Sequence, residues 1–263
     1  MNKDFKNKNE WALILGGSSG LGLATAKKLA QHGMNIIIVY RNRKSELPQI
    51  EIDFKEIKNL EVKFCSFHID MLKPEKRAET IEKIIQITDE GGIKTIIHSI
   101  AKGNLKPMIN AEQVLKNDDF HLTINAMAIS LYDWVISVFN AKLFTKDARV
   151  ISFTSEGNTK AWKNYAAVSA AKVTLEAITR SIALEFAPYG IKANCLQPGA
   201  VNTQSLRLIP GYEKIIEHSI HRNPFNRITT PQDVANVAYL LCKDEAAWIN
   251  GCVIPVNGGE HLN

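Results

Sequence analysis

The 263-residue sequence predicts a single α/β domain, a doubly wound parallel sheet of about seven strands with helices on both faces. Three observations predict this fold class. Short runs rich in Ile and Val alternate with amphipathic stretches along the chain. These runs are apolar at nearly every residue, as expected of strands that are buried on both faces of a parallel sheet. No linker, repeat or low-complexity segment divides the chain, so one domain is the simplest organisation.

The predicted elements follow one another in a regular order. The strand "WALILGG" leads into a helical stretch at 21–32, and "NIIIVY" leads into a charged connection. The strand "VKFCSFHI" precedes a helix at 74–90. "IKTIIHSI" and "ARVISFTS" each precede a long helix, expected near 118–143 and 165–187, and "IKANCLQPG" and "CVIPVNGG" close the series. Crossovers between such strands should be right-handed.

Two segments fall outside this rhythm. Residues 1–9 are basic and are expected to form a loose N-terminal arm before a domain that spans 10–263. Residues 204–230 interrupt the last two strand–helix units and contain Pro210, Gly211 and Pro224. In an open α/β sheet, an insertion after the carboxyl end of a strand lies over the ligand crevice. We therefore expect 204–230 to form a substrate lid.

Composition and charge narrow the classes of function. Charged residues make up 22% of the chain and its formal net charge is +5, which is too mild to indicate nucleic-acid binding. The four cysteines are scattered and lack the spacing of a metal or redox site. Free thiols in a reducing cytoplasm are therefore expected. No apolar run reaches membrane-spanning length, so no membrane span is expected.

A glycine-rich turn follows the first strand. In "LGGSSGLG", Gly16, Gly20 and Gly22 stand at the start of the first helix. A dinucleotide needs a tight turn, close approach of the backbone to its pyrophosphate, and helix N–H groups aimed at the phosphates. Glycine lacks the Cβ that would block this approach, and Ser18 and Ser19 can add hydroxyl donors. The strand–turn–helix context predicts a dinucleotide site here.

A tyrosine and a lysine lie seven residues apart in "NYAAVSAAK". On an α-helix, residues i and i+7 point within roughly 20° of each other, so Tyr165 and Lys172 would share one face about two turns apart. A phenol titrates at about 10 in free peptides and needs a nearby cation to act near neutral pH. Lys172 would supply that cation, which predicts a catalytic pair.

These features together resemble the short-chain dehydrogenase/reductase family, from about residue 10 to the C-terminus. The resemblance also rests on Asp70, Asn125, "PGAVNT" at 198–203 and the closing "VNGG". It implies a Rossmann-like fold, a usually tetrameric assembly and a nicotinamide cofactor. By resemblance, the residues that would hold the cofactor are Gly16, Ser18, Ser19, Gly20, Leu21, Gly22, Tyr40, Arg41, Asp70, Met71, Ser99, Ile100, Ala101, Lys172, Pro198, Gly199, Val201 and Thr203.

The end of the second strand indicates which nicotinamide binds. NAD enzymes place a carboxylate there for the ribose 2′-hydroxyl, and NADP enzymes place a cation for the 2′-phosphate. This chain has Tyr40 and Arg41 there, and its next acid is Glu46. A guanidinium can grip a phosphate through two hydrogen bonds. We therefore predict NADPH rather than NADH, with Arg41 as the main discriminator.

The Tyr-x6-Lys spacing resembles one branch of the family, the enoyl-acyl-carrier-protein reductases of bacterial fatty-acid synthesis. "HSIA" at 98–101 is similar to the main enoyl type. Ser155 stands where that type has a second tyrosine. A serine at this place together with the Tyr-x6-Lys spacing looks more like the NADPH-dependent third type of these reductases. The resemblance implies reduction of the 2,3 double bond of a trans-2-enoyl thioester. The catalytic residues that it implies are Tyr165, Lys172, Asn125 and Ser155. The substrate would be carried by acyl carrier protein.

Two other functions stay open. A carbonyl reductase of the same family, acting on a 3-oxoacyl thioester, would use the same tyrosine to protonate an alkoxide. Only the Tyr-x6-Lys spacing and "HSIA" argue against it. A non-catalytic NADP-binding sensor could also be built on this fold. The presence of Tyr165, Lys172 and Asn125 argues against the sensor.

Overall fold

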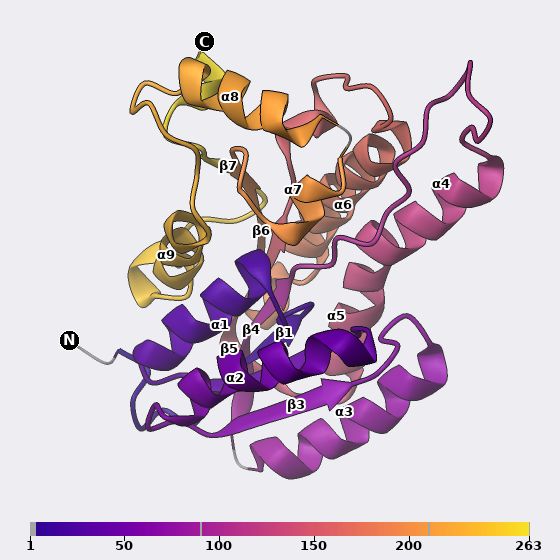
Figure 1. Cartoon of the computed structure of the whole chain (residues 1–263). Helices are drawn as coiled ribbons and strands as arrows, with labels where there is room; N and C mark the ends of the chain where they lie inside the picture. Colours follow the sequence, from indigo (N-terminus) through magenta and orange to yellow (C-terminus); the bar gives the residue numbers. More distant parts are fainter. Residues whose placement is uncertain (1–3, 90, 210, 263) are drawn as a thin grey trace.

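The computed structural model describes residues 4–89, 91–209 and 211–262 and confirms the predicted doubly wound sheet (Figure 1). The strands pair in parallel in the order β3-β2-β1-β4-β5-β6-β7. Their bounds are β1 (Glu10–Leu15), β2 (Asn35–Tyr40), β3 (Phe64–His68), β4 (Gly92–His98), β5 (Phe144–Phe153), β6 (Ile191–Pro198) and β7 (Val253–Val256). The order reverses between β1 and β4, and ligands bind outside the carboxyl ends of the strands at such a point.

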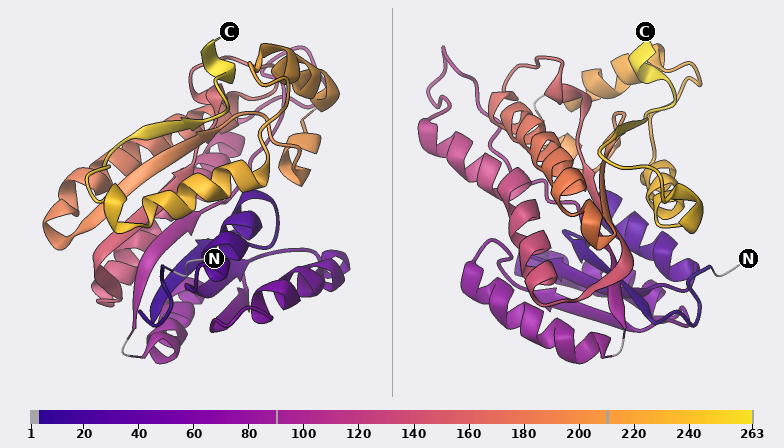
Figure 2. Two further views of the ribbon diagram at one scale, coloured as in Figure 1. Left: turned by 90° about the vertical axis from the view of Figure 1, so that its left-hand side faces the viewer. Right: turned by 180° about the vertical axis from the view of Figure 1, so that it is seen from behind.

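Helices cover both faces of the sheet (Figures 1 and 2). One face is covered by α1 (Gly20–Gln31), α2 (Leu47–Lys58) and α9 (Pro231–Leu241). The other is covered by α3 (Pro74–Thr88), α5 (Ser130–Asn140) and α6 (Ala166–Glu185). Successive strand residues divide between the two layers: Leu13 packs with α3, α5 and α6, and Ile14 with α1, α2 and α9. This alternation explains why the strands are apolar at nearly every residue.

The charged connection expected after the second strand is instead a helix. A 3₁₀ turn at Lys44–Glu46 leads into α2, which packs on the sheet. Its buried residues are Ile50, Phe54 and Ile57, at helical spacing. The many charged residues between them hid this apolar stripe, so the prediction of a mere connection was wrong.

The N-terminal arm is also better ordered than expected. Within residues 4–9, Phe5 is buried in the layer formed by α1 and α9. Its backbone N–H donates to the His32 carbonyl at 3.0 Å, and its ring meets Tyr239 edge-on at 6.1 Å between centroids. The described part of the arm therefore packs on the domain, because one aromatic side chain anchors it; residues 1–3 lie outside the described residues.

A long helix runs from α4 (Asn117–Ile124) through a π-helical turn (Asn125–Ile129) into α5. By length and apolarity alone it could cross a membrane. Half of its apolar window is buried in the domain, where Trp134 and Val138 pack against the sheet, so its apolar character is that of a core helix. Its outer face exposes Leu122, Ile129 and Tyr132. These side chains fit the expected tetramer, which stays a prediction.

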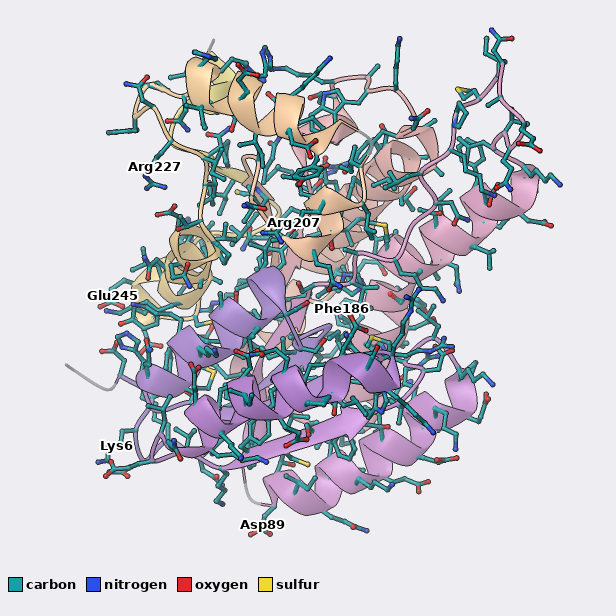
Figure 3. All side chains as sticks on the ribbon, in the orientation of Figure 1. Lys6, Asp89, Phe186, Arg207, Arg227 and Glu245 are labelled. Carbon is teal, nitrogen blue, oxygen red and sulfur yellow. The ribbon has the colours of Figure 1, made fainter. Side chains whose placement is uncertain are left out.

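Within 204–209 and 211–230, the described parts of the expected lid, the structure has the helices α7 (Gln204–Arg207) and α8 (Tyr212–Arg222). Figure 1 places both above the carboxyl ends of the central strands, with α8 next to the C-terminal 3₁₀ turn at Glu260–Leu262. Figure 3 shows Arg207 on α7, between α8 and the N-terminal end of α1 in that view. The segment thus overhangs the crevice in which the site is built.

Candidate active site

A pocket of about 990 Å³ opens at the carboxyl ends of the central strands. Segments that follow β1, β4, β5 and β6 line it, together with α7 and α8. The predicted site residues that line it are Gly16, Ser19, Gly20, Leu21, Ser99, Ile100, Ala101, Ser155, Tyr165, Lys172, Pro198, Gly199, Val201 and Thr203. The fold therefore brings together the glycine turn and the tyrosine–lysine pair, which are far apart in the sequence.

The three glycines of the turn have different tasks. Gly16 has a positive φ of +86°, and a Cβ there would lie 2.5 Å from the Ser99 carbonyl oxygen. At Gly22 a Cβ would clash with the Gly16 carbonyl, so this glycine lets α1 pack closely on the turn. At Gly20 an added Cβ would meet only Thr203, at 3.5 Å. The backbone at Gly20 thus faces the pocket and is open to a ligand.

The N-terminus of α1 offers unused donors to the pocket. Ser19 is the N-cap but makes no capping hydrogen bond, and the first turn of the helix contains no acid. The first N–H groups of a helix have no intrahelical partner and carry the positive end of its dipole. Because Gly20 and Leu21 line the pocket, these donors fit a pyrophosphate. The residues present therefore suit a dinucleotide.

Arg41 and Asp70 follow β2 and β3 and form an ion pair with each other. The Arg41 side chain remains 56% exposed, so an incoming phosphate can reach it. Ser18 does not face the pocket: its hydroxyl donates to the side-chain oxygen of Asn42 at 2.7 Å, which fixes the loop behind Arg41. Asn42 was missed from the sequence, although its place directly after Arg41 was the available signal.

Two predicted cofactor residues point their side chains into the core instead. Tyr40 is buried, with its ring stacked on His68 at 4.9 Å between centroids and edge-on to Phe54 at 5.3 Å. Met71 is buried with the α3 and α5 residues, and its carbonyl accepts from the Trp134 indole at 3.1 Å. Both residues belong to the buried core layers. In this structure their side chains pack in the core and do not form the cofactor contacts that the sequence predicted.

Asn125 was predicted to be catalytic, but its side chain is exposed and is absent from the described residues that line the pocket. Met127 lines the pocket instead. Met127, and not Asn125, thus contributes a side chain to the pocket wall in this structure, and a catalytic role for Asn125 stays a prediction.

Tyr165 stands at the N-cap of α6, one residue before the helix, so the helical geometry assumed for the pair applies only to Lys172. The two groups still meet in one pocket because the helix starts beside it. The Ser155 hydroxyl lies 3.3 Å from the Tyr165 hydroxyl. The Lys172 amine donates to the Phe153 carbonyl at 2.6 Å. Among the contacts described, none joins Lys172 directly to the phenol.

Burial sets the protonation of both groups. It raises the pKa of Tyr165, and the Ser155 hydrogen bond offsets only part of this. It lowers the pKa of Lys172 to about 8, against the opposing effects of Cys195 and Glu176. Desolvation thus opposes the charged form of each group, and the catalytic pairing of Lys172 with Tyr165 stays a prediction. Burial therefore favours the protonated phenol of Tyr165, and Lys172 keeps its charge only below about pH 8.

The Tyr165 ring is fixed between two neighbours that the sequence did not reveal. A Cβ at Gly157 would clash with the ring carbon Cε1, so only glycine fits against that edge. The Trp162 ring is tilted against Tyr165 with 5.1 Å between centroids. Met127 and Val168 complete the apolar cluster around it. The phenol is thus held in an apolar wall with its hydroxyl beside Ser155.

A second feature that the sequence did not reveal ties the expected lid at 204–230 to the loop that follows β5. Glu156, next to Ser155, accepts hydrogen bonds from Arg222 of α8 at 2.8 and 3.1 Å. It also pairs with Lys160 at 2.6 Å. These cations lower the pKa of Glu156 against its desolvation. Arg222 further donates to the Glu260 carbonyl at 2.9 Å. The pair joins α8, the C-terminal turn and the loop after β5.

Comparison with known proteins places this geometry in context. Residues 16–261 match the model of a family described as enoyl-(acyl carrier protein) reductase. The NADPH-dependent enoyl-[acyl-carrier-protein] reductase FabI of Staphylococcus aureus (strain MRSA252) is 26% identical over 98% of this chain and 98% of its own. A 7alpha-hydroxysteroid dehydrogenase of Paraclostridium sordellii is 27% identical over 98% of this chain and 94% of its own.

A solved structure agrees in fold. The crystal structure of enoyl-[acyl-carrier-protein] reductase (NADH) from Aquifex aeolicus VF5 superposes with a TM-score of 0.84 at 24% identity, covering 98% of each chain. The relatives thus include proteins named for either nicotinamide, and proteins named for reduction of a C=C bond or for chemistry at a hydroxyl group.

Proposed function

We propose, from the premise that this chain belongs to the enoyl-(acyl carrier protein) reductase family of short-chain dehydrogenases/reductases, that it reduces the 2,3 double bond of trans-2-enoyl thioesters with NADPH. The chain is an NAD(P)H-dependent oxidoreductase, as its family is. We place the reaction in cytoplasmic fatty-acid synthesis. The observation that carries the proposal is the phenol of Tyr165, set in an apolar wall of the pocket that the glycine turn also lines.

The chain's own residues would act on the substrate oxygen. When bound, a nicotinamide would supply hydride to the β-carbon. The negative charge that develops on the thioester oxygen would then accept a hydrogen bond from the Tyr165 hydroxyl. A proton taken up from water by the α-carbon would collapse this enolate and complete the reduction. Ser155, at 3.3 Å, orients that hydroxyl. Lys172 holds the Phe153 carbonyl and stays close enough to the pocket to bind a ribose hydroxyl.

The rest of the pocket suits an acyl thioester. Its apolar wall near Tyr165 is formed by Leu105, Met127, Trp162, Val168 and Ile209. This wall supports binding of an acyl chain. The described residues on its rim also include basic side chains, namely Lys163, Lys214 and His218. Such a rim supports an acidic carrier protein as the donor of the thioester.

A paired assay tests the proposed substrate. The protein is given crotonyl-CoA and acetoacetyl-CoA in parallel, each with NADPH and with NADH, and kcat/KM is measured for all four pairs. Crotonyl-CoA with NADPH is expected to give the highest value. The second candidate is a carbonyl reductase, which the similarity to a hydroxysteroid dehydrogenase favours. A preference for acetoacetyl-CoA would overturn the enoyl assignment in its favour.

The nicotinamide preference is tested by Arg41→Asp. The new carboxylate would repel the 2′-phosphate of NADPH and would lie beside Asp70. We expect KM for NADPH to rise about 10- to 100-fold, as for loss of a hydrogen bond to a charged group, and KM for NADH to change little. Arg180→Asp, at an exposed position on α6, is the control. Equal changes for both nicotinamides would show that Arg41 does not select between them.

A further inference from the structure

The loop after β5 positions Ser155 beside Tyr165, the proposed hydrogen-bond donor to the substrate oxygen. It runs from Thr154 through Ser155 into the 3₁₀ turn Glu156–Asn158. Ser155 reaches the Tyr165 hydroxyl at 3.3 Å, and Gly157 packs against the Tyr165 ring. A small shift of this loop would therefore change both the hydrogen bond and the packing of the phenol.

A carboxylate on α6 holds both ends of this loop. Glu176 lies one helical turn after Lys172. Its Oε1 atom accepts from the Thr154 hydroxyl, and also from the Asn158 side-chain amide at 2.5 Å. Thr154 is buried, and Thr154 and Asn158 flank Ser155 on either side. One oxygen atom thus closes the loop over a span that contains Ser155.

Charge makes this clamp stronger than a neutral one. A carboxylate can only accept hydrogen bonds, and bonds to a charged acceptor are about twice as strong as neutral ones. Glu176 is also a nearby negative charge that favours the protonated form of Lys172. Glu176 therefore acts on Lys172 and on the loop that contains Ser155. It is not one of the described residues that line the pocket.

We propose that Glu176 is a positioning residue for the reduction: it fixes Ser155 against Tyr165 by tying Thr154 and Asn158 to α6. It touches neither the substrate nor the cofactor and acts through the loop. The inference rests on the proposed function only in taking Tyr165 as the donor to the substrate oxygen. It does not depend on whether that oxygen belongs to an enoyl or a keto thioester.

The first test compares Glu176→Leu with Glu176→Gln. Leu removes both acceptor oxygens. Gln keeps the shape of the side chain and one acceptor oxygen but has no charge. We expect kcat to fall about 10- to 100-fold for Leu and by less for Gln, with KM for NADPH unchanged within about threefold. Glu185→Leu and Glu185→Gln, at an exposed site on the same helix, are matched controls. Thermal unfolding of every variant establishes that it is folded, and Gln carries the test if Leu does not fold.

A double-mutant cycle separates positioning from a general loss of structure. Thr154→Val is made alone and together with Glu176→Gln. If Glu176 acts through Thr154, the two losses in kcat are less than additive. Fully additive losses, or a wild-type kcat in Glu176→Gln, would overturn the proposal.

The outcomes distinguish this inference from the proposed function. Each variant is assayed with both crotonyl-CoA and acetoacetyl-CoA, so a preference for the keto substrate overturns only the enoyl assignment. Hydrogen exchange over residues 154–165 gives a readout without turnover. Exchange there is expected to be faster in both Glu176 variants than in wild type. Unchanged exchange would overturn the clamp whatever the substrate.

Discussion

Tyr165→Phe is expected to lower kcat about 100- to 1,000-fold, the usual cost of removing one donor to a developing oxyanion. The phenol is the group best placed to donate, since burial raises its pKa and keeps it protonated. Phe keeps the ring, which packs between Gly157 and Trp162, so the wall of the pocket should be preserved. KM for NADPH and the melting temperature should therefore change little. The measurement is steady-state kinetics with both nicotinamides and both thioesters.

Tyr189→Phe is the matched control, because it removes a hydroxyl from an exposed tyrosine in the 3₁₀ turn that follows α6. It should leave kcat at the wild-type value. If Tyr165→Phe retained most of its kcat, the phenol would not be the donor. The next candidate would be Ser155, whose hydroxyl lies 3.3 Å from the Tyr165 hydroxyl. If cofactor affinity fell together with kcat, the effect would lie in binding rather than in the chemical step.

Lys172→Met is expected to lower turnover about 100-fold and to weaken NADPH binding, without lowering stability. The side chain is a buried cation that holds the Phe153 carbonyl at 2.6 Å. Met fills similar space but provides neither charge nor donor. Wild-type kcat/KM should also fall as the pH rises through about 8, because Lys172 then loses its charge. This limb of the pH profile should be absent from the residual activity of Lys172→Met.

Burial lowers the Lys172 pKa from 10.5 to about 8 in the folded protein. The unfolded chain therefore holds this proton more tightly, so Lys172 opposes folding below about pH 8, and the penalty fades as the pH rises toward 10.5. At pH 7, Lys172→Met should melt at the same temperature as wild type or higher, and the gain should shrink at high pH.

Lys55→Met, at an exposed position on α2, is the control for loss of a lysine. It should alter neither kinetics nor the pH profile. A strong fall in the melting temperature of Lys172→Met at pH 7 would mean that its bond to the Phe153 carbonyl stabilises the fold by more than desolvation of the amine costs. An unchanged kcat in Lys172→Met would show that Lys172 has no role in turnover.

The sequence by itself determined the architecture and the chemistry that the site contains. The apolar runs identify the strands because a strand buried on both faces needs an apolar residue at each position, as Leu13 and Ile14 illustrate. The glycine turn is recognisable because Gly16 and Gly22 meet backbone that no Cβ could approach. The presence of Tyr165 and Lys172 in one pocket also follows from their place at the start of a helix beside the sheet edge.

Tertiary structure alone decided where several side chains point and what holds them. Asn125 is exposed and outside the pocket lining, and Tyr40 is buried in the core, because the packing of neighbouring helices selects one side of each element. The clamp from Glu176 to Thr154 joins residues 22 apart, and the bond from Arg222 to Glu156 joins residues 66 apart. Local patterns encode secondary structure, but such contacts exist only once distant elements have packed. Burial, which raises the pKa of Tyr165 and lowers that of Lys172, likewise arises only from the folded chain.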